Sequence, residues 1–141
     1  MEQAKQRVMV VDDDPDFVET VRPVLEEAGY AVVAAYNGTE CLAKLDQAKP
    51  DVILLDIMMS TWGEGFAVAD KLKAMGPDRG IPVILVSSLN LKSELEPGPG
   101  LQSMLSVDAC LVKPVPRREL LDQVAASLKK AAGRRSGRQE G

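Results

Sequence analysis

Short apolar runs alternate with segments of helical period along most of this chain. The runs are residues 7–11, 30–35, 52–56, 82–87 and 109–112. The segments between and after them carry apolar residues three or four positions apart, as on one face of a helix. Strands that alternate with helices are typical of a parallel sheet, because parallel neighbours need a long crossover connection. We therefore predict an α/β fold with a five-stranded parallel sheet.

The predicted helices begin and end at residues that favour such boundaries. Pro15 suits the first turn of a helix, and Gly29 suits the position just past its end. Thr39 is expected to cap a second helix, and residues 66–75 are predicted to form a third. The last helix is predicted from the apolar stripe of Leu120, Leu121, Val124, Ala125 and Leu128.

Composition excludes several classes of function. The 141 residues suit one domain, and a hydrophobic content of 45% is enough for a core. The chain has no histidine, which excludes sites that need imidazole, and its two cysteines form no metal-ligand pattern. The net charge of −4 argues against direct nucleic-acid binding. No apolar stretch is long enough to span a membrane and the N-terminus is polar, so we expect a cytoplasmic protein without membrane contact.

The end of the chain differs in composition from the rest. Residues 133–141, GRRSGRQEG, contain no apolar side chain that could join a core. We therefore expect 132–141 to be a disordered tail and 6–131 to be the folded domain. The arginines of the tail are interpreted as solvated charge rather than as a nucleic-acid arm.

Polar side chains follow four of the five predicted strands. Asp12 and Asp13 follow the first, Asp56 ends the third, Ser87 ends the fourth and Lys113 follows the fifth. The carboxyl ends of parallel strands share one edge of the sheet, where ligands bind in open α/β folds. Crowded carboxylates need a cation, and oxygen ligands suit Mg²⁺. This arrangement favours acyl phosphate formation on one carboxylate, while the amine and the hydroxyl hold phosphoryl oxygens.

Each of these residues, taken alone, also has a simpler interpretation. An acidic stretch such as VDDDPD often caps a helix, and Asp14 is expected to do so here. Ser87 alone could be an ordinary hydroxyl at a strand end, Lys113 a surface lysine and Asp56 a cap for the next turn. The simpler interpretations require a coincidence at four strand ends, so one shared site is favoured.

The motifs VMVVDDDP, DVILLDIMM, IPVILVSS and CLVKP, in this order, resemble the receiver domain of two-component response regulators. The resemblance extends over residues 6–131. It implies the flavodoxin-like (CheY-like), doubly wound fold with strand order 2-1-3-4-5 in a single domain. It also implies a phosphorylation-dependent switch, which promotes its own phosphoryl transfer and autodephosphorylation and is otherwise no enzyme.

The resemblance further implies roles for single residues. Asp56 would accept a phosphoryl group from a histidine of a sensor kinase. Lys113 would contact this group, and Ser87 would be the switch hydroxyl. The implied ligands of Mg²⁺ are Asp12 (mostly through water), Asp13, Asp56 and the backbone carbonyl of Met58.

The implied partners are proteins. A sensor histidine kinase or a phosphotransfer protein would supply the phosphoryl group, and a downstream protein or a detached output domain would receive the signal. A phosphorylation-dependent dimer is a further expectation. The family's switch aromatic is replaced here by Cys110, and the stretch 88–106 contains EPGPG, which disfavours a regular helix. We therefore expect the signal to leave through 88–106.

Two alternative functions stay open at this point. A pseudo-receiver would keep the fold and bind partners without using the phosphate. A metal phosphatase that resembles the haloacid-dehalogenase group would use Asp12 as its nucleophile, since Asp12 and Asp14 match the first half of that group's D-x-D-x-[TV] motif. Asp16 stands where the motif has Thr or Val, which disfavours the phosphatase.

Overall fold

The computed structural model describes residues 5–56, 81–87 and 109–140. The elements in chain order are β1 (Arg7–Val11), α1 (Pro15–Glu27), β2 (Ala31–Ala35), α2 (Gly38–Ala48), β3 (Val52–Asp56), β4 (Val83–Ser87), β5 (Ala109–Val112) and α6 (Arg117–Glu140). The predicted helix at 66–75 and the segment 88–106 lie outside the described residues. No helix within the described ranges has the length and apolar character needed to cross a membrane.

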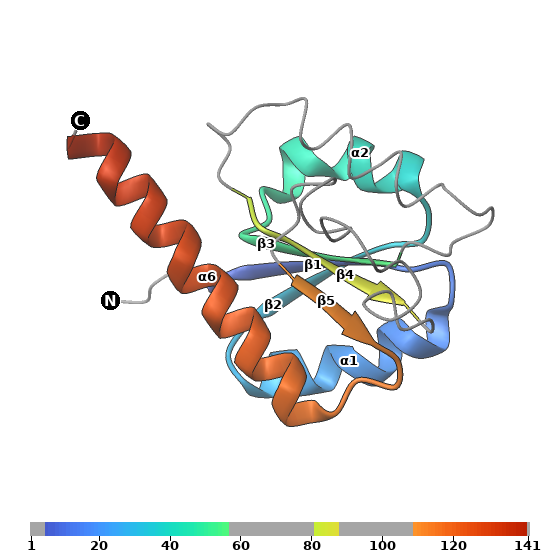
Figure 1. Ribbon diagram of the computed structural model, residues 1–141. Coiled ribbons are helices and arrows are strands. Elements are labelled where there is room, and N and C mark those ends of the chain that lie inside the picture. Colours follow the sequence, from blue (N-terminus) through green and yellow to red (C-terminus); the bar gives the residue numbers. More distant parts are fainter. Residues whose placement is uncertain (1–4, 57–80, 88–108, 141) are drawn as a thin grey trace, which may run out of the picture.

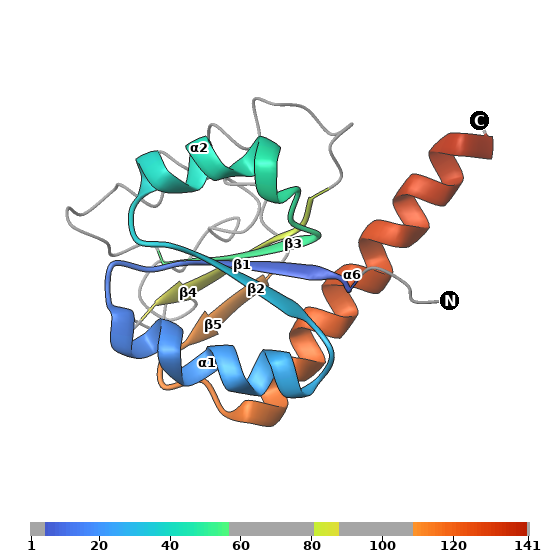
Figure 2. The same ribbon diagram turned by 180° about the vertical axis from the view of Figure 1, so that it is seen from behind.

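The strands form one parallel sheet in the order β2-β1-β3-β4-β5. This arrangement confirms the predicted fold class, strand order and single domain. Helices α1 and α6 cover one face of the sheet, and α2 lies on the other face (Figures 1 and 2). The central strands are therefore buried on both faces, which explains why their sequences are continuous apolar runs.

Alternate residues of strands β1 to β4 contribute to two separate cores. In β1, Val8 and Val10 face α1 and α6, whereas Met9 and Val11 face α2. The larger core collects Val18, Val21 and Leu25 of α1 with Leu120, Val124 and Leu128 of α6. The smaller core includes Cys41 and Leu45 of α2. Both layers hold the strands in a register that aligns their carboxyl ends.

Helix α1 begins and ends where the sequence predicts. Asp14 is its N-cap, and a carboxylate oxygen of Asp14 accepts a hydrogen bond of 3.0 Å from the backbone N–H of Asp16. Pro15 occupies the first turn, where no partner for its nitrogen is needed. Gly29, just past the end, has a φ of 101°, a conformation that strains residues with a Cβ.

The cap of α2 is Asn37, so the prediction that Thr39 caps this helix was wrong. Asn37 has an extended backbone, and its Oδ1 accepts a hydrogen bond of 2.8 Å from the N–H of Glu40. The Glu40 carboxylate in turn accepts a 3.3 Å bond from the N–H of Tyr36. Both Asn and Thr can cap helices, and this reciprocal arrangement favours the earlier residue.

Helix α6 continues to Glu140, where the sequence analysis predicted a disordered tail over 132–141. The helix runs past the end of the sheet (Figure 1). A lack of apolar residues predicts that a segment adds nothing to a core, but it does not prevent helix formation. Arg, Gln and Glu favour helices, and no proline follows Pro116 to stop one. The boundary of the domain at residue 131 stays a prediction.

Candidate functional site

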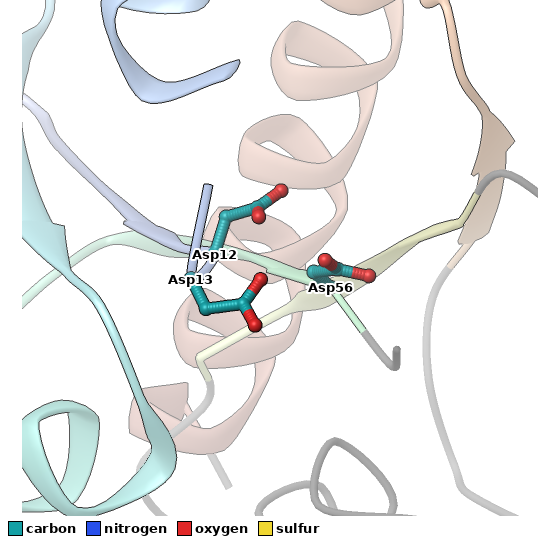
Figure 3. Close-up of side chains that lie close together, drawn as sticks. All are labelled: Asp12, Asp13 and Asp56. Carbon is teal, nitrogen blue, oxygen red and sulfur yellow. The ribbon is translucent and has the colours of Figure 1, made fainter. Parts of the chain in front are cut away.

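Three carboxylates meet at the carboxyl edge of the sheet. Asp12 directly follows β1 and Asp56 ends β3, and these two strands are neighbours. Each of Asp12, Asp13 and Asp56 places one carboxylate oxygen within 4.8 Å of those of the other two. Figure 3 shows the three side chains turned toward one another. Asp12 and Asp56 are buried and Asp13 is exposed, so the cluster opens to solvent on the side of Asp13.

Lys113 brings positive charge into this cluster from the far edge of the sheet. It follows β5, which β3 and β4 separate from β1. Its Nζ donates a hydrogen bond of 2.6 Å to Oδ2 of Asp12 and a longer one of 3.5 Å to Oδ2 of Asp56. The ammonium group therefore contacts both buried carboxylates, as the convergence of strand ends predicts.

The pKa of Lys113 reflects two opposed effects. Burial acts to lower it, because burial penalises the charged form of an amine. The hydrogen bond and charge of Asp12, together with the charge of Asp56, act in the other direction and leave the pKa above its ordinary value. Lys113 is therefore an ammonium at neutral pH, able to bind an anionic oxygen.

Asp12 is held on both of its carboxylate oxygens. Oδ1 accepts a 2.9 Å hydrogen bond from the backbone N–H of Asp14, and Oδ2 accepts from Lys113. The backbone N–H of Asp12 donates to the carbonyl of Ala35 on β2 at 3.0 Å. The three adjacent acids thus differ in role, because Asp14 caps α1 while Asp12 and Asp13 face the cluster.

The cluster has the chemistry of a site for a hard divalent cation. Among the residues that the structure describes, one ammonium group faces the three carboxylates of this cluster. The remaining donors are oxygens, which Mg²⁺ prefers over the nitrogen and sulfur ligands of softer metals. Because Asp13 is exposed, a cation could keep some of its water while it binds. The residues present therefore fit the ion that the sequence analysis expects.

Comparison with known proteins identifies the family of this fold and site. Residues 8–125 match the family described as the response regulator receiver domain. The chain belongs to this family. The match includes β1 with its acids, β3 with Asp56 and β5 with Lys113. It does not favour the haloacid-dehalogenase alternative.

Individual relatives agree with this assignment. The DNA-binding response regulator MtrA of Mycolicibacterium smegmatis is 28% identical over 130 residues, which are 92% of this chain and 54% of MtrA. The DNA-binding dual master transcriptional regulator RpaA of Synechocystis is 33% identical over 125 residues, 88% of this chain and 49% of RpaA. The chain thus spans about half the length of these curated relatives.

A solved receiver domain has a closely similar fold and extent. The structure of a CheY-like response regulator receiver domain protein from Methanospirillum hungatei superposes with a TM-score of 0.78 at 26% identity. The alignment covers 93% of this chain and 99% of the other. The receiver domain of this chain therefore accounts for nearly all of its described structure.

Some predicted site residues lie partly or wholly outside the described structure. Ser87 ends β4, and the backbones of Val86 and Asp56 are register partners, so Ser87 belongs to the same edge of the sheet. Its side chain and that of Cys110 in β5 lie outside the described structure, as does Met58 altogether. The roles of these residues remain predictions.

Sequence analysis missed one contact of the site. The Nζ of Lys113 lies over the ring of Phe17, 4.3 Å from its centroid. The spacing of Phe17 in the sequence is that of a residue on the apolar face of α1, and its ring does pack against the larger core. One feature of the sequence could have indicated this contact. An aromatic residue stands in the first helical turn after the acids, close to the edge of the sheet where ligands are expected to bind.

Proposed function

We propose that this receiver domain accepts a phosphoryl group on Asp56 and acts as a phosphorylation-dependent signalling switch. The observation that carries the proposal is the placement of the buried Asp56 carboxylate, 3.5 Å from the ammonium of Lys113 and beside two further carboxylates. A carboxylate held next to a cation at a solvent-accessible edge is suited to attack a phosphorus atom.

In the proposed transfer, an oxygen of Asp56 forms a bond to phosphorus as the bond to the donor breaks. With a phosphohistidine donor, the electron pair of the broken P–N bond returns to the imidazole of the donor. Asp12, Asp13, Asp56 and the Met58 carbonyl would hold Mg²⁺, which when bound supplies positive charge that offsets the repulsion between these acids and the phosphoryl group.

Lys113 would move only slightly to contact the product. It now donates to Asp12 at 2.6 Å and to Asp56 at 3.5 Å. A phosphoryl group on Asp56 presents three new anionic oxygens, which attract the ammonium away from Asp12. The Ser87 hydroxyl would bind another of these oxygens and pass the change to the segment that follows β4.

The proposed partners follow from the family. A sensor histidine kinase or a phosphotransfer protein would donate the phosphoryl group, and a downstream protein or a separate output domain would respond. MtrA and RpaA are described as DNA-binding. Our expectation that this chain does not itself bind nucleic acid stays a prediction. Autodephosphorylation, a phosphorylation-dependent dimer and a cytoplasmic location stay predictions as well.

The first test is the intact mass after incubation with acetyl phosphate and Mg²⁺. We expect one added phosphoryl group, which chelation of Mg²⁺ prevents and which Asp56→Asn abolishes. The Asp56→Asn variant also separates this mechanism from that of a phosphatase of the dehalogenase type, which would need Asp12 as its nucleophile and would still be modified. Phosphorylation of the Asp56→Asn protein would disprove the assignment, and an unmodified wild-type protein would favour the pseudo-receiver.

A further inference from the structure

We propose that Phe17 is a positioning residue whose ring keeps the ammonium of Lys113 beside Asp56. The contact itself is an observation, with Nζ 4.3 Å from the ring centroid. A lysine ammonium within about 6 Å of an aromatic centroid is attracted by the electron-rich face of the ring. The consequence for phosphoryl transfer rests on the function proposed above.

The ring is fixed relative to the acids of the site. Phe17 lies in the first turn of α1, where its backbone N–H donates a 3.2 Å hydrogen bond to the carbonyl of Asp14. The same residue, Asp14, donates its own N–H to Asp12. The ring also packs against the core between α1, α6 and the sheet. Short, rigid connections therefore join the ring to the carboxylates.

Lys113, by contrast, needs a contact other than the carboxylates to stay in place when these bind a cation. A lysine side chain is a flexible four-carbon stem with a compact charge, and solvent competes for that charge. The side chain of Lys113 is 21% exposed, so it has access to water. Partial burial strengthens the attraction between an ammonium and a ring face, because less of the charge is screened.

The ion pair with Asp12 cannot serve this purpose throughout the reaction. A divalent cation that binds the acid cluster would compete with Lys113 for Asp12 and would repel the ammonium. The ring of Phe17 carries no formal charge and offers no metal ligand. Its attraction for the ammonium therefore persists when the carboxylates bind a cation, and Lys113 stays within reach of Asp56.

The first experiment measures the contact without phosphorylation. In an NMR spectrum of the wild-type protein, the ε-methylene protons of Lys113, assigned by their loss in Lys113→Met, should be shifted upfield by the ring. Phe17→Leu should remove this shift and Phe17→Tyr should retain it, both with and without Mg²⁺. Phe17→Met, also apolar and without a ring, is the second variant if Phe17→Leu does not fold.

The second experiment measures the rate of phosphorylation by acetyl phosphate. Phe17→Leu should slow it about fivefold, the effect of losing one ammonium–ring contact, and Phe17→Tyr should restore it. In a Lys113→Met background, Phe17→Leu should cause no further loss. Tyr30→Leu is the matched control, because Tyr30 packs against the same core and its removal tests the loss of an aromatic ring in general.

Several results would overturn the inference. A Lys113 shift that survives in Phe17→Leu would show that the ring does not hold the ammonium. If Phe17→Leu and Tyr30→Leu slow phosphorylation equally, Phe17 is only a packing residue. The same conclusion follows if Phe17→Leu slows phosphorylation equally in the wild-type and Lys113→Met backgrounds. A wild-type protein that never gains phosphate would refute the proposed function, and the NMR comparison would then decide the contact alone.

Discussion

Lys113 shows how single residues acquire their properties from the fold. Its ammonium group lies against Asp12, Asp56 and Phe17, which follow β1, end β3 and belong to α1, respectively. Asp12 and Lys113 are 101 positions apart in the sequence. Each is an ordinary residue locally, and the alignment of strand ends brings them together in a charged cluster.

Cys41 is a second residue whose chemistry depends on burial. It lies on the buried side of α2, and burial raises the pKa of its thiol from 9.0 to about 11. In a Cys110→Ser background, which leaves one thiol, we expect Cys41 to resist a thiol reagent at pH 8 until the protein unfolds. Rapid labelling under native conditions, at a rate equal to that of the unfolded chain, would contradict this.

The same shift predicts a pH effect on stability. Between pH 9 and 11 the unfolded chain loses the Cys41 proton first, so the free energy of unfolding falls as the pH rises through this range. The raised pKa of Lys113 acts in the same direction. Comparison with Cys41→Ala therefore isolates the contribution of the thiol. The free energy of unfolding, measured with urea, should fall less steeply with pH in this variant than in the wild-type protein.

The elements of the fold are delimited by short polar contacts. Asp14 and Asn37 cap α1 and α2, and both caps follow directly on the ligand edge of the sheet. Helix caps satisfy backbone N–H groups that have no partner within the helix. The caps therefore stabilise the helices and also set where the chain turns away from the site.

The cap of α2 gives a prediction at the scale of the element. Asn37→Ala should lower the free energy of unfolding by about 1 kcal/mol, because it removes the bond to the N–H of Glu40. Thr39→Ala is the matched control, since Thr39 is exposed inside the first turn and alanine favours helices. Urea unfolding measures the free energy of unfolding of both variants. A greater loss of this free energy in Thr39→Ala than in Asn37→Ala would show that Thr39 is the cap.

Across the whole molecule, α6 combines a packed part with an extension. The buried side chains described for this helix are Leu120, Val124, Ser127 and Leu128. The match to the receiver family ends at residue 125, whereas the helix continues to Glu140. The described buried side chains therefore lie in the part of α6 nearest β5.

Truncation tests this division of α6. A chain that ends at Lys130 should keep its phosphorylation by acetyl phosphate and should lose less than about 1 kcal/mol of unfolding free energy, since it retains the described buried residues. A chain that ends at Ala126 lacks Leu128 and should be markedly less stable. Equal loss in the two truncations would assign the extension a structural role in the domain.

The sequence by itself determined the strands, their parallel order and the residues at their carboxyl ends. These features follow from local apolar patterning and from the resemblance of four motifs, and neither requires knowledge of distant contacts. The sheet order and the gathering of Asp12, Asp13, Asp56 and Lys113 agree with that prediction.

Only the tertiary structure decided that Phe17 lies beside the site and where α2 begins and α6 ends. Phe17 has the spacing of a core residue, and its contact with Lys113 arises because the end of β5 places the ammonium over the ring. Asn37 and Thr39 are both competent caps, and the hydrogen bonds of Asn37 with Glu40 and of Glu40 with Tyr36 favour Asn37. Helix α6 extends beyond the core because backbone hydrogen bonds along a helix need no apolar partner, and the apolar pattern records only burial.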